Sequence, residues 1–366
     1  MIKEGKFGVQ EAVCLTTIAI STKIFFTSPG FLTRYVGNAG WYMTLISNMT
    51  AIAVFALICL LLKRFPGKSI TEIFDLAMGR VLGFIFSLIL TLAFVYSAGV
   101  IVREFADVSK TFTLPASPIS MIIGGLVLVV LVAAFLGLET IARAAKLFGY
   151  VLLFMYISVL VLAAQHYEPG NLFPILGFGL DQTVIHGLKR SAAYEEVVIL
   201  AVFAGSLQGV NHIRRAGFIS LILSGLIISG GLLCFSLAFP VFTNQEVTSP
   251  MYILTRIIRY GTFFQRLDPI FLLLWTSATF ITVSALFYAS VSTYCKTFRL
   301  QDPRPVVIPM LVILFGFAIM PRDFATVVEG AVEGAREYGW VVFYGLHLFT
   351  LLVAVIRKKR GDQADA

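Results

Sequence analysis

Charged side chains are scarce in this 366-residue sequence: they make up 13% of it, whereas 58% of the residues are hydrophobic. A soluble globular domain carries about 25% charged residues, so about half of the usual polar cover is missing. This shortage excludes an ordinary soluble domain and indicates a protein embedded in a membrane, with the lipid bilayer as its surroundings.

Motifs of soluble catalysis and metal binding are also absent. The sequence has no P-loop, no dinucleotide-binding glycine fingerprint, no HExxH, no CxxC and no nucleophile elbow. We therefore expect no enzymatic activity, no cofactor and no metal ion. The few cysteines lie inside apolar runs, as buried reduced thiols do: Cys14, Cys59, Cys234 and Cys295.

Apolar stretches of spanning length, about 20 residues, recur along the whole chain. We place ten spans at 9–35, 40–62, 81–106, 118–137, 142–164, 186–209, 216–241, 268–295, 305–321 and 338–356. The sequence therefore predicts an all-α membrane protein of ten transmembrane helices. We expect a single domain over residues 1–360 and a disordered tail at 361–366.

The distribution of Lys and Arg predicts the orientation. With the N-terminus inside, 17 of these residues lie on the inner side and 10 on the outer side, and Lys23 lies within the membrane. Basic residues favour the cytoplasmic side, so both termini are predicted to be cytoplasmic. The net charge of +8 follows from these loops and does not indicate a nucleic-acid partner.

Lys23 is the most informative residue of the first span. It lies about 14 residues into the span, which is roughly 21 Å along a helix and close to mid-bilayer. An ionised lysine there costs at least about 2.5–3.5 kcal/mol. The hydroxyls of Ser21 and Thr22 precede it and Pro29-Gly30 follows, which indicates an interrupted helix facing protein or a cavity. The alternative is a lysine that reaches an interface from a misplaced span.

The sixth span carries the counterpart, the adjacent carboxylates Glu195 and Glu196. Neighbours on a helix point about 100° apart, so both face one cavity only if the helix unwinds. Lys23 with one of them would form a buried ion pair or a proton relay, and the sequence leaves the choice of glutamate open. In the alternative reading they cap a span that starts at Val197, but that span would be too short to cross.

The remaining candidates are weaker. Tyr96, in the third span, and Ser277, in the hydroxyl-rich eighth span, could line a pocket, although packing is the better explanation for Tyr96. Arg103 and Asp107 form an i,i+4 pair, either a surface salt bridge or an outer gate. His347 is more typical of a hydrogen-bonded core histidine.

Two connections have helical signatures. Ser69-Ile-Thr-Glu72 is a capping box. Residues 250–260 place apolar side chains on one face, which indicates either an outer interfacial helix or an ordinary loop helix.

The first and sixth spans each open a set of five, which predicts repeats at about 9–164 and 186–356. Five is odd, so the second repeat would run with inverted topology. Broken helices at matching positions of inverted repeats mark the binding site in one class of transporters.

Several segments in this order resemble the GerAB-type permeases of spore germination, a branch of the amino acid–polyamine–organocation transporter superfamily. The segments are Ile20-Ser-Thr-Lys-Ile-Phe-Phe-Thr-Ser-Pro29, Ala193-Tyr-Glu-Glu-Val-Val-Ile-Leu200, Arg266-x-Asp268 with Trp275, Phe280 and Tyr288, Lys296-Thr-Phe-Arg-Leu300, and Pro321-Arg-Asp323. The resemblance covers nearly the whole chain.

The resemblance implies a LeuT-like fold with 5+5 inverted repeats and discontinuous first and sixth helices. It implies the B subunit of a nutrient germinant receptor in the spore inner membrane, acting with A and C subunits on a small nutrient, expected to be an amino acid. The implied ligand site at the two breaks comprises Thr22, Lys23, Ile24, Ala193, Tyr194, Glu195 and Glu196.

Two rival functions remain open at this point. The chain could be a proton-coupled amino acid permease in which Lys23, Glu195 or Glu196 titrates. It could also be a structural membrane partner that has lost ligand binding.

Overall fold

The first membrane element of the computed structural model, which describes residues 5–260, 264–265 and 267–361, is broken into two short helices. Helix α1 (Val9–Ser21) is followed by a 3₁₀ turn, η1 (Thr22–Phe25), and then by α2 (Ser28–Val36). A second 3₁₀ turn, η2 (Gly37–Ala39), leads into α3. The break falls at Lys23, as the sequence predicts.

The rest of the first half is formed by long helices joined by short connections. Its elements are α3 (Gly40–Arg64), α4 (Ile70–Met78), α5 (Arg80–Phe112), α6 (Ile119–Leu136), α7 (Leu138–Leu162), η3 (Ala163–His166) and η4 (Pro169–Leu172). The predicted capping box opens α4, where the Ser69 amide donates to Glu72 Oε2 at 2.8 Å.

The second half also opens with a broken element. Its helices and turns are α8 (Leu180–Lys189), η5 (Arg190–Val198), α9 (Ile199–Val202), η6 (Ala204–Ser206), α10 (Val210–Ala238), α11 (Val241–Glu246), α12 (Pro250–Ile257), α13 (Asp268–Thr297), α14 (Arg304–Ile319), η7 (Thr326–Val332), α15 (Glu333–Trp340), η8 (Val341–Gly345) and α16 (Leu346–Ile356). The predicted helix at residues 250–260 is α12, which ends at Ile257. Strands β1 (Arg259–Tyr260) and β2 (Phe264–Gln265) then pair antiparallel, Arg259 with Gln265.

The predicted ten crossings are confirmed. In the described part of the chain, seven apolar helical runs are long enough to cross a membrane, and they match the second to fifth, seventh, eighth and tenth spans. The shorter α14 matches the ninth span. The first and sixth elements complete the set, and their breaks explain why neither forms one long helix.

Span boundaries were less accurate than span number. The tenth helical run begins at Thr326 rather than at 338, the sixth element begins at Leu180, and α5 extends to Phe112. The early turns of the tenth run carry Glu333 and Arg336, which lower its hydropathy although both are buried. A hydropathy profile counts each charged residue as polar, whether or not it has a partner on another helix.

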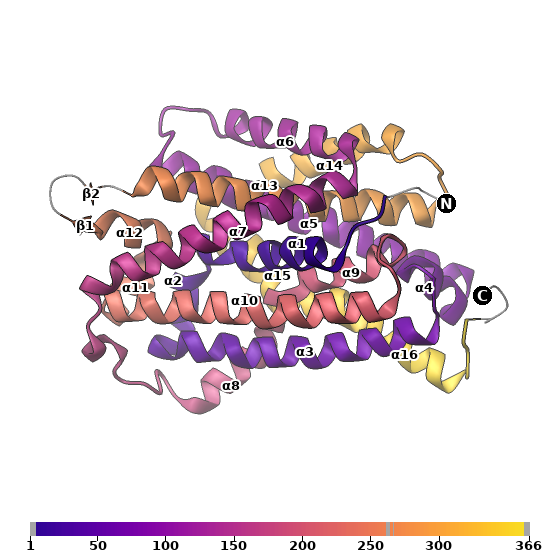
Figure 1. Ribbon diagram of the computed structural model, residues 1–366, viewed down its shortest axis with the longest axis horizontal. Helices are drawn as coiled ribbons and strands as arrows, with labels where there is room; N and C mark the ends of the chain where they lie inside the picture. The colour runs from indigo at the N-terminus through magenta and orange to yellow at the C-terminus, as the bar shows by residue number, and fades with distance from the viewer. Residues whose placement is uncertain (1–4, 261–263, 266, 362–366) are drawn as a thin grey trace.

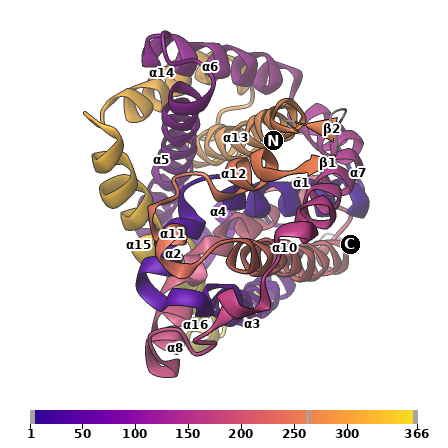
Figure 2. The same cartoon turned by 90° about the vertical axis from the view of Figure 1, so that its left-hand side faces the viewer.

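The helices pack into one bundle along the long axis of the molecule. Figure 1 shows α3, α10, α7 and α13 running along this axis. Seen from one end in Figure 2, α5, α6 and α14 lie on one side, and α3, α8 and α16 on the opposite side. The start of α1 and the end of α16 lie toward the same end (Figure 1), as an even number of crossings requires.

Helices α3 and α10 make a close contact that holds the two halves together. A Cβ on Gly217 of α10 would lie 2.1 Å from the Phe55 ring of α3. About two turns away along α3, Asn48 Nδ2 donates to the Leu221 carbonyl at 2.9 Å. Small residues and interhelical hydrogen bonds associate membrane helices in this way.

Two predictions involve residues outside the described part of the chain. They are the disordered tail, of which residues 362–366 are not described, and Arg266 of the Arg266-x-Asp268 segment.

Candidate functional site

The break in the first membrane element exposes backbone polar groups in the middle of the bundle. After η1, Phe26 is extended (φ −100°, ψ −154°), and α2 begins with Pro29 in its first turn, where a proline costs no hydrogen bond. The Thr22 hydroxyl bonds the Ile18 carbonyl at 2.6 Å and lies 2.8 Å from the Thr282 hydroxyl of α13. These contacts hold η1 against α13.

The sixth membrane element unwinds at the matching position. Its segment η5 is a 3₁₀ helix in which Tyr194 leaves helical geometry (φ −115°, ψ 15°). The buried Tyr194 hydroxyl donates to the Thr44 carbonyl of α3 at 3.1 Å, which fixes the turn. The unwinding brings the Ala193 carbonyl and the two following glutamates close to the first break.

Lys23 joins the two breaks. Its Nζ donates to Glu196 Oε2 and to the Ala193 carbonyl, both at 2.7 Å. The Lys23 side chain is 12% exposed and the Glu196 side chain 1% exposed. The structure therefore selects Glu196 as the partner of Lys23. A buried pair of this kind is stable only with good geometry and further hydrogen bonds, and the Ala193 carbonyl supplies one.

Glu195 points elsewhere. Its Oε1 lies 3.5 Å from the Ser97 hydroxyl of α5, and among the described residues its Oε2 has no hydrogen-bond partner. That oxygen lies against α15, because a Cβ added to Gly339 would be 2.5 Å from it. The two adjacent glutamates thus face different helices.

Two further buried charge contacts lie near the Lys23 pair, since Arg190 and Arg336 border the same cavity as Lys23. Glu104 of α5 accepts hydrogen bonds from the amide (3.0 Å) and the hydroxyl of Thr27, and its Oε2 lies 3.7 Å from Arg336 of α15. Arg190 of η5 forms a two-pronged pair with Glu333, at 2.7 and 2.8 Å. Together they tie both broken elements to the tenth helical run.

The Arg103–Asp107 pair on α5 is buried. Arg103 Nε donates to Asp107 Oδ2 at 2.9 Å, and Arg103 Nη1 donates to the Pro321 carbonyl at 2.7 Å. Both residues are more than 90% buried. The reading as a surface salt bridge is therefore wrong, because the loop after α14 folds over the pair.

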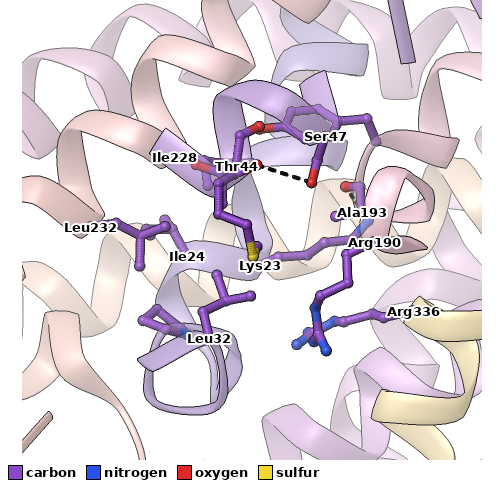
Figure 3. A pocket seen from close by; sticks show the side chains of 13 residues that line it. Lys23, Ile24, Leu32, Thr44, Ser47, Arg190, Ala193, Ile228, Leu232 and Arg336 are labelled. Carbon is purple, nitrogen blue, oxygen red and sulfur yellow. Dashed lines mark hydrogen bonds between the residues drawn. The ribbon is translucent and has the colours of Figure 1, made fainter. Parts of the chain in front are cut away.

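The cavity at the centre of the bundle is small, its surface is mostly apolar, and three basic residues border it. Its volume is about 30 Å³, enough for a water molecule or two. Figure 3 shows Arg190 and Arg336 converging beside Lys23, with Ile24, Leu32 and Leu232 on the apolar side. The other lining residues are Pro29, Met43, Thr44, Ser47, Ala193, Tyr194 and Ile228.

Four of the predicted site residues line this cavity, namely Lys23, Ile24, Ala193 and Tyr194. Glu195 and Glu196, which follow Tyr194 in the chain, are buried but do not line it. Ser21 and Thr22 instead border a separate groove between α1, α7 and α10, with a volume of about 790 Å³.

Tyr96 and Ser277 lie apart from the cavity. Tyr96 packs edge-on against Phe317, with ring centroids 5.5 Å apart, whereas its neighbour Ser97 faces Glu195. Ser277 is partly exposed, and Thr282 is the α13 hydroxyl that reaches the break. His347 is buried against the Phe74 ring.

The sequence interpretation missed Glu104, Arg190, Glu333 and Arg336 as site residues. Arg190 and Arg336 are among the ten basic residues that the predicted orientation places on the outer side. The available signal was the repeated occurrence of charged residues just before the tenth predicted span, and the structure shows that they face the bundle. In the described ranges, no three His, Cys, Asp or Glu residues are grouped to hold a metal ion.

Comparison with known proteins places this geometry in context. Residues 10–326 match the model of the spore permease family, described as spore germination protein. The chain is 28% identical to spore germination protein KB of Bacillus subtilis (strain 168) over 370 residues, covering 99% of this chain and 98% of that protein.

Two solved transporters share the fold. A nucleobase-cation-symport-1 family transporter in a closed conformation with bromovinylhydantoin bound aligns with a TM-score of 0.70 at 16% identity, over 100% of this chain and 82% of the other. A Na⁺-coupled sialic acid symporter in an outward-open state aligns with a TM-score of 0.68 at 12% identity, over 95% and 80%. The predicted LeuT-like fold is confirmed.

Proposed function

The chain belongs to the spore germination permease family, and from this premise we propose that it is the nutrient-binding B subunit of a germinant receptor. The observation that carries the proposal is the Lys23–Glu196 pair, which joins the two broken elements inside the membrane. Buried intramembrane charges are costly and mark functional sites. A pair that bridges the two breaks can respond to a ligand placed between them.

We propose that the ligand is a small nutrient, an amino acid, bound where the central cavity now lies. The present cavity of about 30 Å³ is far smaller than the roughly 300 Å³ or more of a typical ligand pocket. Binding therefore requires the broken elements to move apart. Such movement strains the contacts of Lys23, Arg190 and Glu104, so ligand occupancy changes the shape of the bundle.

The proposed setting is the spore inner membrane, with both termini on the core side. Relatives such as the KB protein are named as spore germination proteins, which supports this setting. A receptor that senses a nutrient without converting it needs partners to pass the signal on. We propose the A and C subunits of the receptor as these partners.

Lys23 also supports a receptor without sodium coupling. A sodium ion bound between the breaks would need oxygen ligands, and here the lysine ammonium already occupies the Glu196 carboxylate and the Ala193 carbonyl. We therefore propose that the Lys23 ammonium occupies the position at which a sodium-coupled transporter would bind its sodium ion. The second candidate function is a proton-coupled amino acid permease, which the buried Glu195 carboxylate favours as a titrating group.

Deletion of the gene in its spore-forming host tests the proposal. We expect the spores to lose germination in response to at least one nutrient and to regain it with a wild-type copy, while germination triggered by other receptors continues. Membrane insertion of the complementing copy is checked by immunoblot. Unchanged responses of the deletion strain to every nutrient that germinates wild-type spores would refute the receptor function.

A further inference from the structure

A long groove runs along α1 on the face of the bundle where this helix lies between α7 and α10 (Figure 1). Its volume is about 790 Å³, and most of the side chains that line it are apolar. Several on its rim are exposed, among them Tyr150, Ile157 and Leu226. The hydroxyl oxygens of Thr17 and Ser21 border the groove but are themselves buried. The groove is therefore an apolar channel that opens to the hydrocarbon of the bilayer.

The groove extends from the side of the termini to the first break. Helices α1, α7 and α10 belong to the first, fifth and seventh crossings, so all three begin on the side where α1 begins. Along α10 the groove extends from Arg215 to Gly230, which is about 15 residues and roughly 22 Å. One leaflet with its headgroup region is roughly 20–22 Å thick. The groove thus has the depth of one leaflet.

A positive charge lies at the end of the groove on the side of the termini. Arg215, in the second turn of α10, borders the groove and is exposed. In the described part of the chain its guanidinium has neither an ion pair nor a hydrogen bond. Lys146 of α7, one turn before Gly149, is instead engaged by Glu11 at 2.7 Å. The charge of Arg215 is therefore available to a ligand in the groove.

The size of the groove restricts what can occupy it. An empty groove would leave its lining atoms without dispersion contacts. A transmembrane helix is about 10–12 Å across, and roughly 22 Å of it would occupy roughly 1,700–2,500 Å³, more than twice the volume of the groove. Acyl chains are thinner, and the surrounding bilayer supplies them.

We propose that the groove binds one anionic phospholipid of the leaflet on the side of the termini. Its phosphate lies on Arg215, and its acyl chains follow α1 as far as Phe25. Basic residues at a membrane surface attract acidic headgroups, and the planar guanidinium of arginine suits a phosphate. In a zwitterionic lipid the headgroup's own cation competes with Arg215, so the anionic lipid binds better.

This lipid site is separate from the central cavity but reaches the same break. The rings of Phe25 and Tyr156 meet edge-on, with centroids 6.2 Å apart, and the Tyr156 hydroxyl donates to the Ile227 carbonyl of α10 at 2.7 Å. All three residues line the groove. An acyl chain that covers them holds η1 against α7 and α10, so the bound lipid stabilises the present arrangement of the break.

Lipid retention tests the headgroup site. The full-length chain is reconstituted in vesicles of equal parts phosphatidylglycerol and phosphatidylcholine and extracted in mild detergent, and its bound lipids are counted by native mass spectrometry. We expect one retained phosphatidylglycerol per chain, in preference to phosphatidylcholine. Arg215→Gln should weaken this retention about 5-fold, the effect of one basic residue at an anionic surface. Arg214→Gln is the matched control, since Arg214 does not border the groove.

A groove-filling variant tests the path of the acyl chains. No described atom lies within 4 Å of a Cβ added to Gly230, so Gly230→Leu projects into the groove and should lower retention at least as far as Arg215→Gln does. Gly125 of α6 is equally open but lies outside the groove, so Gly125→Leu is the control. In the wild-type chain, phosphatidylglycerol with a diazirine at the end of one acyl chain should cross-link near Phe25 or Gly230.

Three results would overturn the proposal. Equal retention of the two lipids, or an unchanged count in Arg215→Gln, would mean that the chain carries annular lipid only. A loss in Arg214→Gln as large as that in Arg215→Gln would mean that the basic end attracts lipid without a defined site. Cross-links spread evenly over the lipid-facing helices would exclude the acyl-chain groove, even if Gly230→Leu fails to fold.

Discussion

At the scale of single residues, the site is defined by which buried charges have partners. Lys23 and Glu196 satisfy one another across the two breaks, whereas Glu195, the next residue in the chain, is turned toward α15. A buried ion pair contributes little net stability relative to an apolar replacement, but removing one partner alone is costly. The pair is therefore better explained by function than by stability.

Lys23→Met and Glu196→Gln test this at the residue scale. Each single variant should lower the free energy of unfolding by about 3–5 kcal/mol, because it leaves one uncompensated buried partner. The double variant should regain much of that stability while nutrient binding stays lost. Thermal unfolding and ligand binding of the purified proteins measure both effects.

Lys189→Met is the control, since its ammonium is 55% exposed and lies 3.8 Å from Glu337. It should change stability by less than about 1 kcal/mol. Losses in the double variant equal to the sum of the single losses, or wild-type nutrient binding in any of the three variants, would contradict the assigned role.

At the scale of elements, the tenth helical run packs beside both breaks. It contacts η5 through Arg190–Glu333, α5 through Glu104–Arg336, and Glu195 through the space at Gly339. The π-helical segments η7 and η8 flank α15, and such segments are frequent at functional sites. The short α15 is thus the part of the run that faces Glu195 and, through Arg336, the central cavity.

Gly339→Ala tests the packing of α15 against η5. The new methyl group would lie 2.5 Å from Glu195 Oε2 and 3.4 Å from Ala192 Cβ, so we expect a loss of about 1–3 kcal/mol in the free energy of unfolding. Adding Glu195→Ala should remove the clash with the carboxylate. Thermal unfolding of the two variants measures the loss and its recovery.

Gly334→Ala is the matched control on the same helix. No described atom lies within 4 Å of its added Cβ, so this variant should be neutral or more stable by about 0.5–1 kcal/mol, through helix propensity alone. Equal destabilisation by both glycine substitutions would show that α15 does not pack on Glu195 as described.

At the scale of the whole molecule, the cavity is closed on the side away from the termini. A hollow of about 170 Å³ on that side, bordered by Arg34 and Glu329, ends at Thr27, whose amide and hydroxyl bind Glu104. On the side of the termini, Lys296 Nζ donates to the Val202 carbonyl at the end of α9, at 3.0 Å. A transporter must open both sides in turn, whereas a sensor needs to open only the side from which its ligand arrives.

Transport in proteoliposomes separates these two functions. For the amino acid that binds, we expect no accumulation above the empty-vesicle level under an imposed inward proton gradient, because a sensor needs to open only the side from which its ligand arrives. The same vesicles should still bind the ligand. Accumulation that collapses on addition of a protonophore would identify the chain as a proton-coupled permease instead.

The sequence by itself determined the membrane class, the number of crossings and the positions of the two breaks. These properties follow from local composition, because hydropathy and helix-breaking residues act over about one span. It also placed a glutamate of the sixth element near Lys23. The prediction of which basic residues lie on the outer side was less accurate, since Arg103, Arg190 and Arg336 are buried within the bundle.

Only the tertiary structure decided which charges meet. Glu196 rather than Glu195 binds Lys23 because η5 unwinds at Tyr194, and a backbone turn of that kind cannot be read from a residue pattern. Arg190 and Glu333 are 143 residues apart in the chain. A charge in a membrane helix lowers its hydropathy in the same way whether or not a distant helix supplies its partner, so its pairing is fixed by the packing alone.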